Sequence, residues 1–416
     1  MGDRQAQRVA GFGPSIFAEM SMLAFQQQAI NLGQGFPDFA APDLIKQAAA
    51  EAIAANLNQY APPFGVARLR QALAAQWERD YAQAVDWQHE VTITSGATEG
   101  LYGLIQALIN PGEQVVVIEP AYDAYHADIS MAGGVALPVR LIPPDTNEQR
   151  WSLDLAALAA ACAQHPKLLL LNTPHNPTGM VLSRAELAQI AELCQHYDIL
   201  VLSDEVYDRM VYAPAEHVPI AMLPGMWERT ITLGSTGKTF GVTGWKVGWA
   251  IGAAALNQAL RNAHQWITFA TPTPLQEATA VAIEQAATSG YYAELQAAYR
   301  ERHAILAEYL RQAGLAPLPV EGAYFVSTDL RHLGHLGHLG HLGHLGHLGV
   351  TSDQRFCRWL ITEIGVAAIP TSPFYSDPSS APAIVRFCFA KQHATLAAAG
   401  QRLQQIPQRL GSLIGL

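Results

Sequence analysis

Short, largely apolar segments alternate with longer amphipathic segments through the middle of this chain. Residues 114–118, 168–171 and 199–202 carry almost no polar side chain. Strands that are buried on both faces have this composition, as in a parallel sheet with helices on both sides. Residues 184–197 between them place apolar side chains at helical spacing. The pattern therefore predicts an α/β fold built on a mostly parallel sheet.

Polar and aromatic side chains follow the ends of these predicted strands. In such sheets a ligand site lies at the carboxyl ends of the strands. We therefore expect the following residues to gather in one place: Ser95 to Thr98, Tyr122, Asn176, Asp204 to Tyr207 and Ser235 to Lys238. This convergence is more specific than any one of the short motifs.

The turn after residues 91–94 joins a short strand to a helix. Ser95 and Gly96 form the turn, and apolar residues at helical spacing follow. Free backbone N–H groups and the helix dipole make such a turn a site for an anion. The alternative is a tight connection without a ligand.

Residues 230–250, TITLGSTGKTFGVTGWKVGWA, place two lysines eight residues apart among glycines and aromatics. A desolvated lysine loses basicity and can form a Schiff base, so Lys238 is a candidate nucleophile. Lys246 and Ser235 remain to hold an anionic group, and the ligand that needs both sites is pyridoxal 5'-phosphate (PLP). Two alternatives are a solvated surface lysine and a phosphate loop. The phosphate loop requires a glycine where this chain has Thr232.

The pattern changes after about residue 280. Fewer strands, interleaved with helices, predict a smaller α+β domain of residues 1–45 and 281–416 beside a large domain of residues 46–280. His-Leu-Gly occurs six times in residues 332–349. A glycine at every third position disfavours a helix, so we interpret the repeat as a lengthened, disordered surface loop; the alternative is adventitious metal binding.

Composition excludes several classes of protein. The chain has 416 residues with 25 basic and 35 acidic side chains, a net charge of −10. It carries no basic run for nucleic acid and no apolar run of the roughly 20 residues of a membrane span. Its four scattered cysteines suit reduced thiols in a cytoplasmic protein, and we expect no metal site.

Together the motifs NLGQGFPDF, NQYAPPFG, SGATEGL, EPAYDAY, NTPHNPTG, SDEVYD, STGKTFGVTGWKVGW, EGAYF and RFCFAK resemble those of fold-type I PLP enzymes of the class I/II aminotransferases. The similarity is greatest to the branch of kynurenine/glutamine transaminases and bacterial methionine aminotransferases. It extends from about residue 16 to the C-terminus and is interrupted by the repeat. It implies a seven-stranded, mostly parallel sheet between helices plus the smaller domain.

The resemblance also implies roles for individual residues. Lys238 forms the Schiff base with PLP and then moves the substrate proton. Asp204 pairs with the pyridine nitrogen, Tyr207 and Asn176 bind the ring oxygen, and Tyr122 stacks on the ring. The phosphate is held by Ala97, Thr98, Ser235 and Lys246.

Substrate and assembly follow from the same resemblance. Arg386, Asn176 and Gly35 hold the α-carboxylate, although an arginine beside Val385 and Phe387 could instead form a structural ion pair. Tyr60 reaches the phosphate of the neighbouring subunit in a homodimer. Phe269 lines an aromatic pocket with Phe36, Tyr60 and Tyr122, which favours methionine, glutamine, phenylalanine or kynurenine as amino donor and a 2-oxo acid as acceptor. The bonds Glu119-Pro120 and Asn176-Pro177 are expected to be cis.

Three alternatives share parts of this pattern. A cysteine-conjugate β-lyase would use the same PLP site, so the motifs near the cofactor do not separate it from a transaminase. An ATPase using GSTGKT and LSDE is disfavoured by Thr232 and by the order of the two motifs. A non-enzymatic regulator built on the same fold is disfavoured, because we find no basic arm or helix-turn-helix extension before the domain in this sequence.

Overall fold

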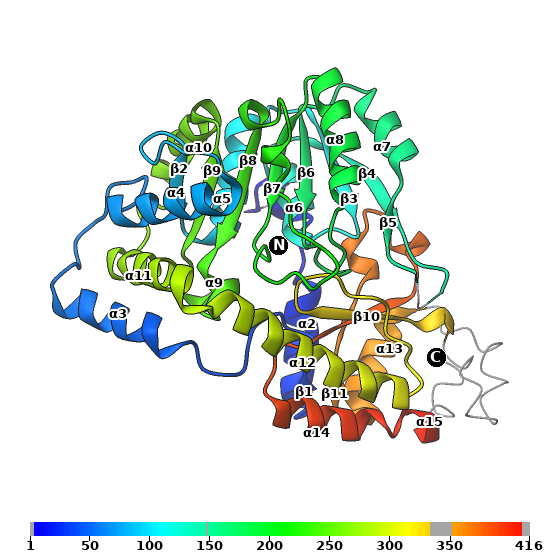
Figure 1. The fold of residues 1–416 in the computed structure, drawn as a ribbon. Coiled ribbons are helices and arrows are strands. Elements are labelled where there is room, and N and C mark those ends of the chain that lie inside the picture. Colours follow the sequence, from blue (N-terminus) through cyan, green and yellow to red (C-terminus); the bar gives the residue numbers. More distant parts are fainter. Residues whose placement is uncertain (1–3, 147–148, 333–351, 410–416) are drawn as a thin grey trace.

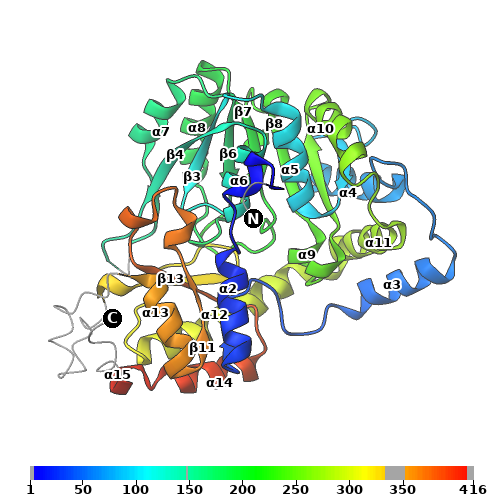
Figure 2. The same cartoon turned by 180° about the vertical axis from the view of Figure 1, so that it is seen from behind.

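An eight-stranded sheet with the order β2-β9-β8-β7-β6-β3-β4-β5 is the centre of the computed structural model, which describes residues 4–146, 149–332 and 352–409 (Figures 1 and 2). Strands β4, β3, β6, β7 and β8 run parallel, whereas β9 and β5 run antiparallel to their neighbours. The strands are β2 (Val91–Thr94), β3 (Gln114–Glu119), β4 (Val135–Ile142), β5 (Ser152–Leu153), β6 (Leu168–Asn172), β7 (Leu200–Asp204), β8 (Thr230–Ser235) and β9 (Gly248–Gly252).

Helices cover both faces of this sheet, as the apolar strands require. Successive side chains of a strand point to opposite faces. Thus Val115 and Val117 belong to the core beneath α5 (Gly96–Leu108), α6 (Asp123–Met131) and α10 (Ala254–Ile267). Val116 and Ile118 belong to the core beneath α7 (Leu155–Cys162) and α8 (Arg184–His196). A third cluster packs α3 (Asp43–Ala54), α4 (Ala67–Tyr81) and α11 (Thr273–Ser289) beside β2 and β9.

The sheet has one more strand than the seven expected from the sequence. The eighth, β5, has two residues and pairs at the outer edge with β4. Strand β4 contains Pro138 and several exposed side chains, so its sequence lacks the apolar run that marks the inner strands. For residues 276–313 the sequence predicts a long helical stretch interrupted near Ser289 and Gly290. The structure confirms this interruption, because α11 and α12 (Tyr291–Gln312) are separated at Gly290, where a φ of +79° favours glycine.

A second layered unit lies against the carboxyl end of the large sheet. Its three-stranded sheet has the order β10-β13-β12, formed by β10 (Phe325–Asp329), β13 (Ile384–Cys388) and β12 (Ile369–Pro370). Its helices are α2 (Ile16–Gln26), α12, α13 (Asp353–Trp359), α14 (His393–Leu403) and α15 (Ile406–Arg409). A short parallel pair of β1 (Ile30–Asn31) and β11 (Val366–Ala367) joins the N-terminal segment to this unit.

We propose the division into domains of residues 46–280 and residues 1–45 with 281–416, with one qualification. Helix α12 packs against α14, but α11 packs against α3 and α4. Because α11 extends to Ser289, the packing supports a boundary at Gly290.

Three further expectations concern segments or features outside the two sheets. The His-Leu-Gly repeat from residue 333 onward lies outside the described residues. Within the described ranges, no helix has the length and apolarity needed to cross a membrane. In the same ranges, no group of three or more His, Cys, Asp or Glu side chains has a geometry suited to a metal ion.

Candidate active site

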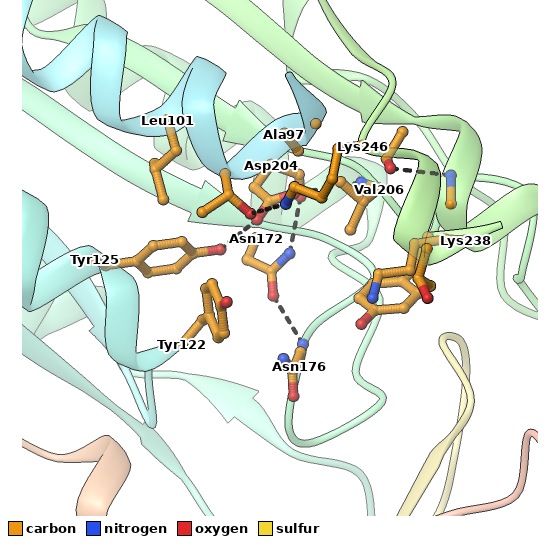
Figure 3. A pocket seen from close by; sticks show the side chains of 16 residues that line it. Ala97, Leu101, Tyr122, Tyr125, Asn172, Asn176, Asp204, Val206, Lys238 and Lys246 are labelled. Atoms are coloured by element: carbon orange, nitrogen blue, oxygen red, sulfur yellow. Dashed lines mark hydrogen bonds between the residues drawn. The ribbon is translucent and has the colours of Figure 1, made fainter. Parts of the chain in front are cut away.

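A cavity of about 140 Å³ opens at the carboxyl ends of β2, β6, β7 and β8 (Figure 3). Residues from strand ends that are far apart in the sequence line it, as the sequence pattern predicts. They are Gly96, Ala97, Thr98, Leu101, Tyr122, Tyr125, Asn172, Asn176, Asp204, Val206, Tyr207, Ser235, Gly237, Lys238, Thr243 and Lys246.

Lys238 lies on α9 (Thr236–Thr239), a single helical turn that follows β8. Its Nζ lies 5.6 Å from the ring centre of Tyr207 and 5.7 Å from that of Tyr324. The side chain faces the cavity, yet burial within the protein lowers its pKa to about 8. An amine with this pKa is largely neutral at mildly alkaline pH and can act as a nucleophile.

Asp204 ends β7 at the floor of the cavity and is 9% exposed. The hydroxyl of Tyr125 donates a hydrogen bond to its Oδ2 at 2.6 Å. Burial raises the pKa of Asp204, while the hydrogen bond from Tyr125 and the positive charge of Lys238 oppose that change. A carboxylate in this position is suited to pair with a positively charged ring nitrogen.

The first turn of α5 forms one end of the cavity. Gly96 adopts a φ of +76°, and the Nζ of Lys246 donates to the Oγ1 of Thr98 at 3.3 Å. The nearby acidic side chain, Glu99, is bound by His264, whose Nδ1 lies 3.0 Å from Oε1. Glu99 also accepts a hydrogen bond from the backbone N–H of Ser95, the N-cap of α5, at 3.0 Å. The rest of this first turn lies beside the lysine and the Thr98 hydroxyl, an arrangement that suits a phosphate group.

The N-terminus of α5 packs tightly against β9. A Cβ atom added to Gly248 would lie 2.5 Å from the backbone N of Ala97. Ser235, the N-cap of α9, accepts a hydrogen bond from the backbone N–H of Gly237 at 3.2 Å. Glycine at 248 thus allows β9 to approach the turn after β2, and Ser235 caps the helical turn after β8.

Arg386 on β13 approaches the cavity from the second unit and is 1% exposed. Its Nη1 donates to Asn176 Oδ1 at 2.6 Å, and its Nη2 donates to the carbonyl of Gly33 at 2.8 Å. The guanidinium carbon lies 4.0 Å from the ring centre of Phe325. In the part of the chain that the structure describes, no carboxylate pairs with Arg386 and its Nε has no hydrogen-bond partner. The structural ion pair considered from the sequence is therefore absent there.

Four of the predicted residues are not part of the lining of this cavity: Arg386, Tyr60, Phe269 and Gly35. Tyr60 is 85% exposed and Phe269 is 46% exposed, and their rings meet edge to face at 5.4 Å between centroids. Gly35 lies on the loop before α3, where its carbonyl accepts a hydrogen bond from Tyr324. A single chain therefore does not place Tyr60 or Phe269 in its own site.

The sequence interpretation missed several residues of the cavity. Two of them, Tyr125 and Asn172, contact Asp204. Tyr125 donates to its carboxylate, and Asn172 Nδ2 donates to its backbone carbonyl at 2.9 Å. A signal for Tyr125 was present: it follows Tyr122, the N-cap of α6, by three residues, and the two rings meet edge to face at 5.6 Å between centroids. The two expected cis bonds, Glu119-Pro120 and Asn176-Pro177, are cis, as are Thr173-Pro174 and Ala213-Pro214.

The fold and the site together define an α/β enzyme in which a lysine, a buried carboxylate and a helix N-terminus meet at the strand ends. The sequence model described as "Aminotransferase class I and II" matches residues 27–403. The chain belongs to this aminotransferase family, and it is an aminotransferase.

Curated relatives and solved structures agree with this assignment. The chain is 38% identical to the methionine aminotransferase of Escherichia coli, over 95% of this chain and 96% of the relative. It is also 38% identical to the kynurenine–oxoglutarate transaminase of Dictyostelium discoideum, over 97% and 96% of the two chains. The structure of N-succinyldiaminopimelate aminotransferase from Mycobacterium tuberculosis matches with a TM-score of 0.88 at 40% identity, over 97% of this chain and 100% of that chain.

These relatives are transaminases, so they do not favour the carbon–sulfur lyase kept open from the sequence. Membership of the family also excludes the interpretation of GSTGKT as part of an ATPase site. The lysine of that motif, Lys238, lines the cavity beside Asp204.

Proposed function

We propose that this aminotransferase uses PLP to transfer the amino group of a neutral or aromatic L-amino acid to a 2-oxo acid. One observation supports the proposal above all others. The amine of Lys238 lines the same cavity as the carboxylate of Asp204 and the N-terminal turn of α5. When bound, PLP supplies an aldehyde that condenses with amines and a ring that accepts electrons from the substrate Cα.

The side chains suit the parts of the cofactor. The phosphate would be held by the amides of Ala97 and Thr98, the hydroxyl of Ser235 and the ammonium of Lys246. Asp204 would keep a proton on the ring nitrogen, while Tyr207 and Asn176 would bind the ring oxygen. Tyr122 would cover the ring face, and burial raises its pKa to about 12, so it remains neutral. Lys238 Nζ, with its pKa near 8, would take the proton from the substrate Cα and return it.

The substrate would enter between Arg386 and the aromatic side chains. Arg386 is a buried cation beside Asn176, so an α-carboxylate would supply its missing charge partner, with Gly35 as a further donor. Phe36 and Tyr122, with Tyr60 and Phe269 from a second subunit, would surround an apolar side chain. The relatives' names include methionine and kynurenine, which agrees with such a pocket.

We also propose a homodimer, because the exposed pair of Tyr60 and Phe269 would complete the neighbouring subunit's site. The cysteines Cys162, Cys194, Cys357 and Cys388 are all free and buried, which supports a reducing compartment such as the cytoplasm.

An absorption experiment tests the proposed reaction. The purified chain with PLP should show a visible band that L-methionine bleaches and a 2-oxo acid restores. Lys238→Ala should lose the lysine-dependent band, whereas Lys46→Ala, at an exposed lysine on α3, should keep it. The kcat/KM values should favour methionine and phenylalanine over aspartate.

Three results would contradict parts of the proposal. A protein that stays colourless with PLP would exclude the cofactor. A preference for aspartate would exclude the apolar pocket. Release of ammonia and pyruvate from cysteine conjugates in place of transamination would revive the lyase.

A further inference from the structure

Lys391 is a buried lysine whose contacts serve one short loop. It follows β13, is 3% exposed, and forms no ion pair with a carboxylate in the described part of the chain. Its Nζ donates to the carbonyl of Phe36 at 2.8 Å and approaches the carbonyl of Gln34 at 3.4 Å. It also lies 4.8 Å from the ring centre of Phe36. Burying an ammonium group without a carboxylate partner costs free energy, so a lysine at this buried position requires a structural or functional reason.

The loop that Lys391 binds spans residues 33–36. Three of its four backbone N–H groups donate a hydrogen bond. Gly33 and Gln34 both donate to the side-chain oxygen of Asn31, at 2.9 and 3.1 Å. Phe36 donates to the carbonyl of Gln34 at 3.1 Å. Among the described residues, no acceptor is within hydrogen-bond distance of the N–H of Gly35. That group is a free donor.

The four carbonyls of the same loop are all bound by side chains from the second unit. Arg386 binds that of Gly33, and the hydroxyl of Tyr324 binds that of Gly35 at 2.5 Å. Lys391 binds the remaining two, one on each side of Gly35. The peptide that carries the free N–H of Gly35 also carries the carbonyl of Gln34. Rotation of this peptide would break the contact between that carbonyl and Lys391, so the contact opposes the rotation.

Gly35 and the buried arginine both lie against the ring of Phe325. A Cβ atom on Gly35 would lie 2.8 Å from the Cζ of Phe325. The guanidinium of Arg386 lies over the same ring, at 4.0 Å from its centre. A carboxylate bound to Arg386 would therefore have a second donor within the same small region.

We propose that Lys391 is a positioning residue for substrate binding. Its ammonium holds the carbonyls on both sides of Gly35 so that the Gly35 N–H faces the substrate carboxylate beside Arg386. This inference rests on the proposed transaminase function, in which Arg386 and Gly35 bind the α-carboxylate. Lys391 itself touches neither substrate nor cofactor.

The experiment uses the PLP-bound protein and compares two amines. L-methionine carries the carboxylate, and 3-(methylthio)propylamine is the same molecule without it. Lys391→Met removes the ammonium but keeps an unbranched apolar stem, and Lys46→Met is the matched surface control. Bleaching of the visible band in single turnovers reports the reaction of each amine.

Lys391→Met should keep the visible band and the wild-type rate with the amine. With L-methionine, the second-order rate constant should fall roughly 10- to 100-fold, the effect of losing one hydrogen bond to a charged group. The loss should appear mainly as a higher half-saturating concentration. Lys391→Arg, which keeps a cation with several donors, should recover most of the loss and provides the test if Lys391→Met does not fold.

Equal losses with both amines would show a merely structural role and overturn the proposal. Unchanged reaction with L-methionine would do the same, as would a failure of Lys391→Arg to recover more than Lys391→Met. Failure of the proposed function itself would look different, because the wild-type protein would then not react with L-methionine at all.

Discussion

At the scale of single residues, the pair of Tyr125 and Asp204 decides how the site holds its negative charge. Burial alone would favour the neutral carboxyl group of Asp204. The hydroxyl of Tyr125 stabilises the carboxylate by a short hydrogen bond, at 2.6 Å. The protonation state of Asp204 that the proposed function requires thus depends on a residue that lies on α6, outside the strand that carries Asp204.

Replacement of Tyr125 tests this dependence. The hydrogen bond from Tyr125 lowers the pKa of Asp204, so Tyr125→Phe should raise it. The inactive, protonated form would then persist to higher pH, and the acidic limb of the kcat/KM profile should move to higher pH. At neutral pH we expect a loss of roughly tenfold. Tyr309→Phe on α12, outside the cavity lining, should leave the profile unchanged.

Whether the sequence could reveal one of these residues depends on how far along the chain its contact partner lies. The positions of Lys238 and Asp204 were predictable because Asp204 ends one buried strand and Lys238 lies in the turn after another. The bond between Tyr125 and Asp204 spans 79 positions, and that between Lys391 and Phe36 spans 355. No local pattern encodes such contacts, since they depend on how the elements pack.

At the scale of elements, the recurring unit is a strand, a tight turn and a helix N-terminus. The bounds of β2 follow directly from its alternating residues and the glycine turn after it. The bounds of the four-residue helix α9 do not follow from the sequence, because a segment this short has no helical period. Likewise, the edge strand β4, with its proline, has no buried run to reveal it.

A substitution at Gly248 tests whether the packing of β9 against α5 sets the anion site. An added methyl group would meet the backbone N of Ala97 at 2.5 Å, so Gly248→Ala should displace the first turn of α5. We expect the dissociation constant for PLP to rise about tenfold, from an overpacking cost of about 1–3 kcal/mol. Gly244→Ala is the matched control, since nothing lies within 4 Å of its added methyl group. Equal PLP affinity in the two variants would contradict the prediction.

At the scale of the whole molecule, several large apolar side chains of the described residues are exposed. Trp266 is 84% exposed at the end of α10, and Ile53 on α3 is 52% exposed. Two such side chains, Tyr60 and Phe269, are in direct contact with each other. Because contiguous exposed apolar groups mark protein interfaces, this pair supports the proposed dimer.

The dimer leads to a prediction that connects assembly with cofactor binding. Light scattering should give twice the mass of one chain. Tyr60→Phe should leave that mass unchanged but raise the dissociation constant for PLP about tenfold, because one hydrogen bond to the phosphate is lost. A monomeric protein with full PLP affinity would contradict both statements.

The contact between Gly33 and Arg386 joins positions 353 residues apart. A ribosome delivers the first long before the second, whereas β2 to β9 emerge within one continuous stretch of synthesis. Under the proposed function, the residues that would hold the phosphate of PLP are therefore all made before Arg386, which would bind the substrate carboxylate. We thus expect a partly made chain to present the groups for the cofactor before it can select a substrate.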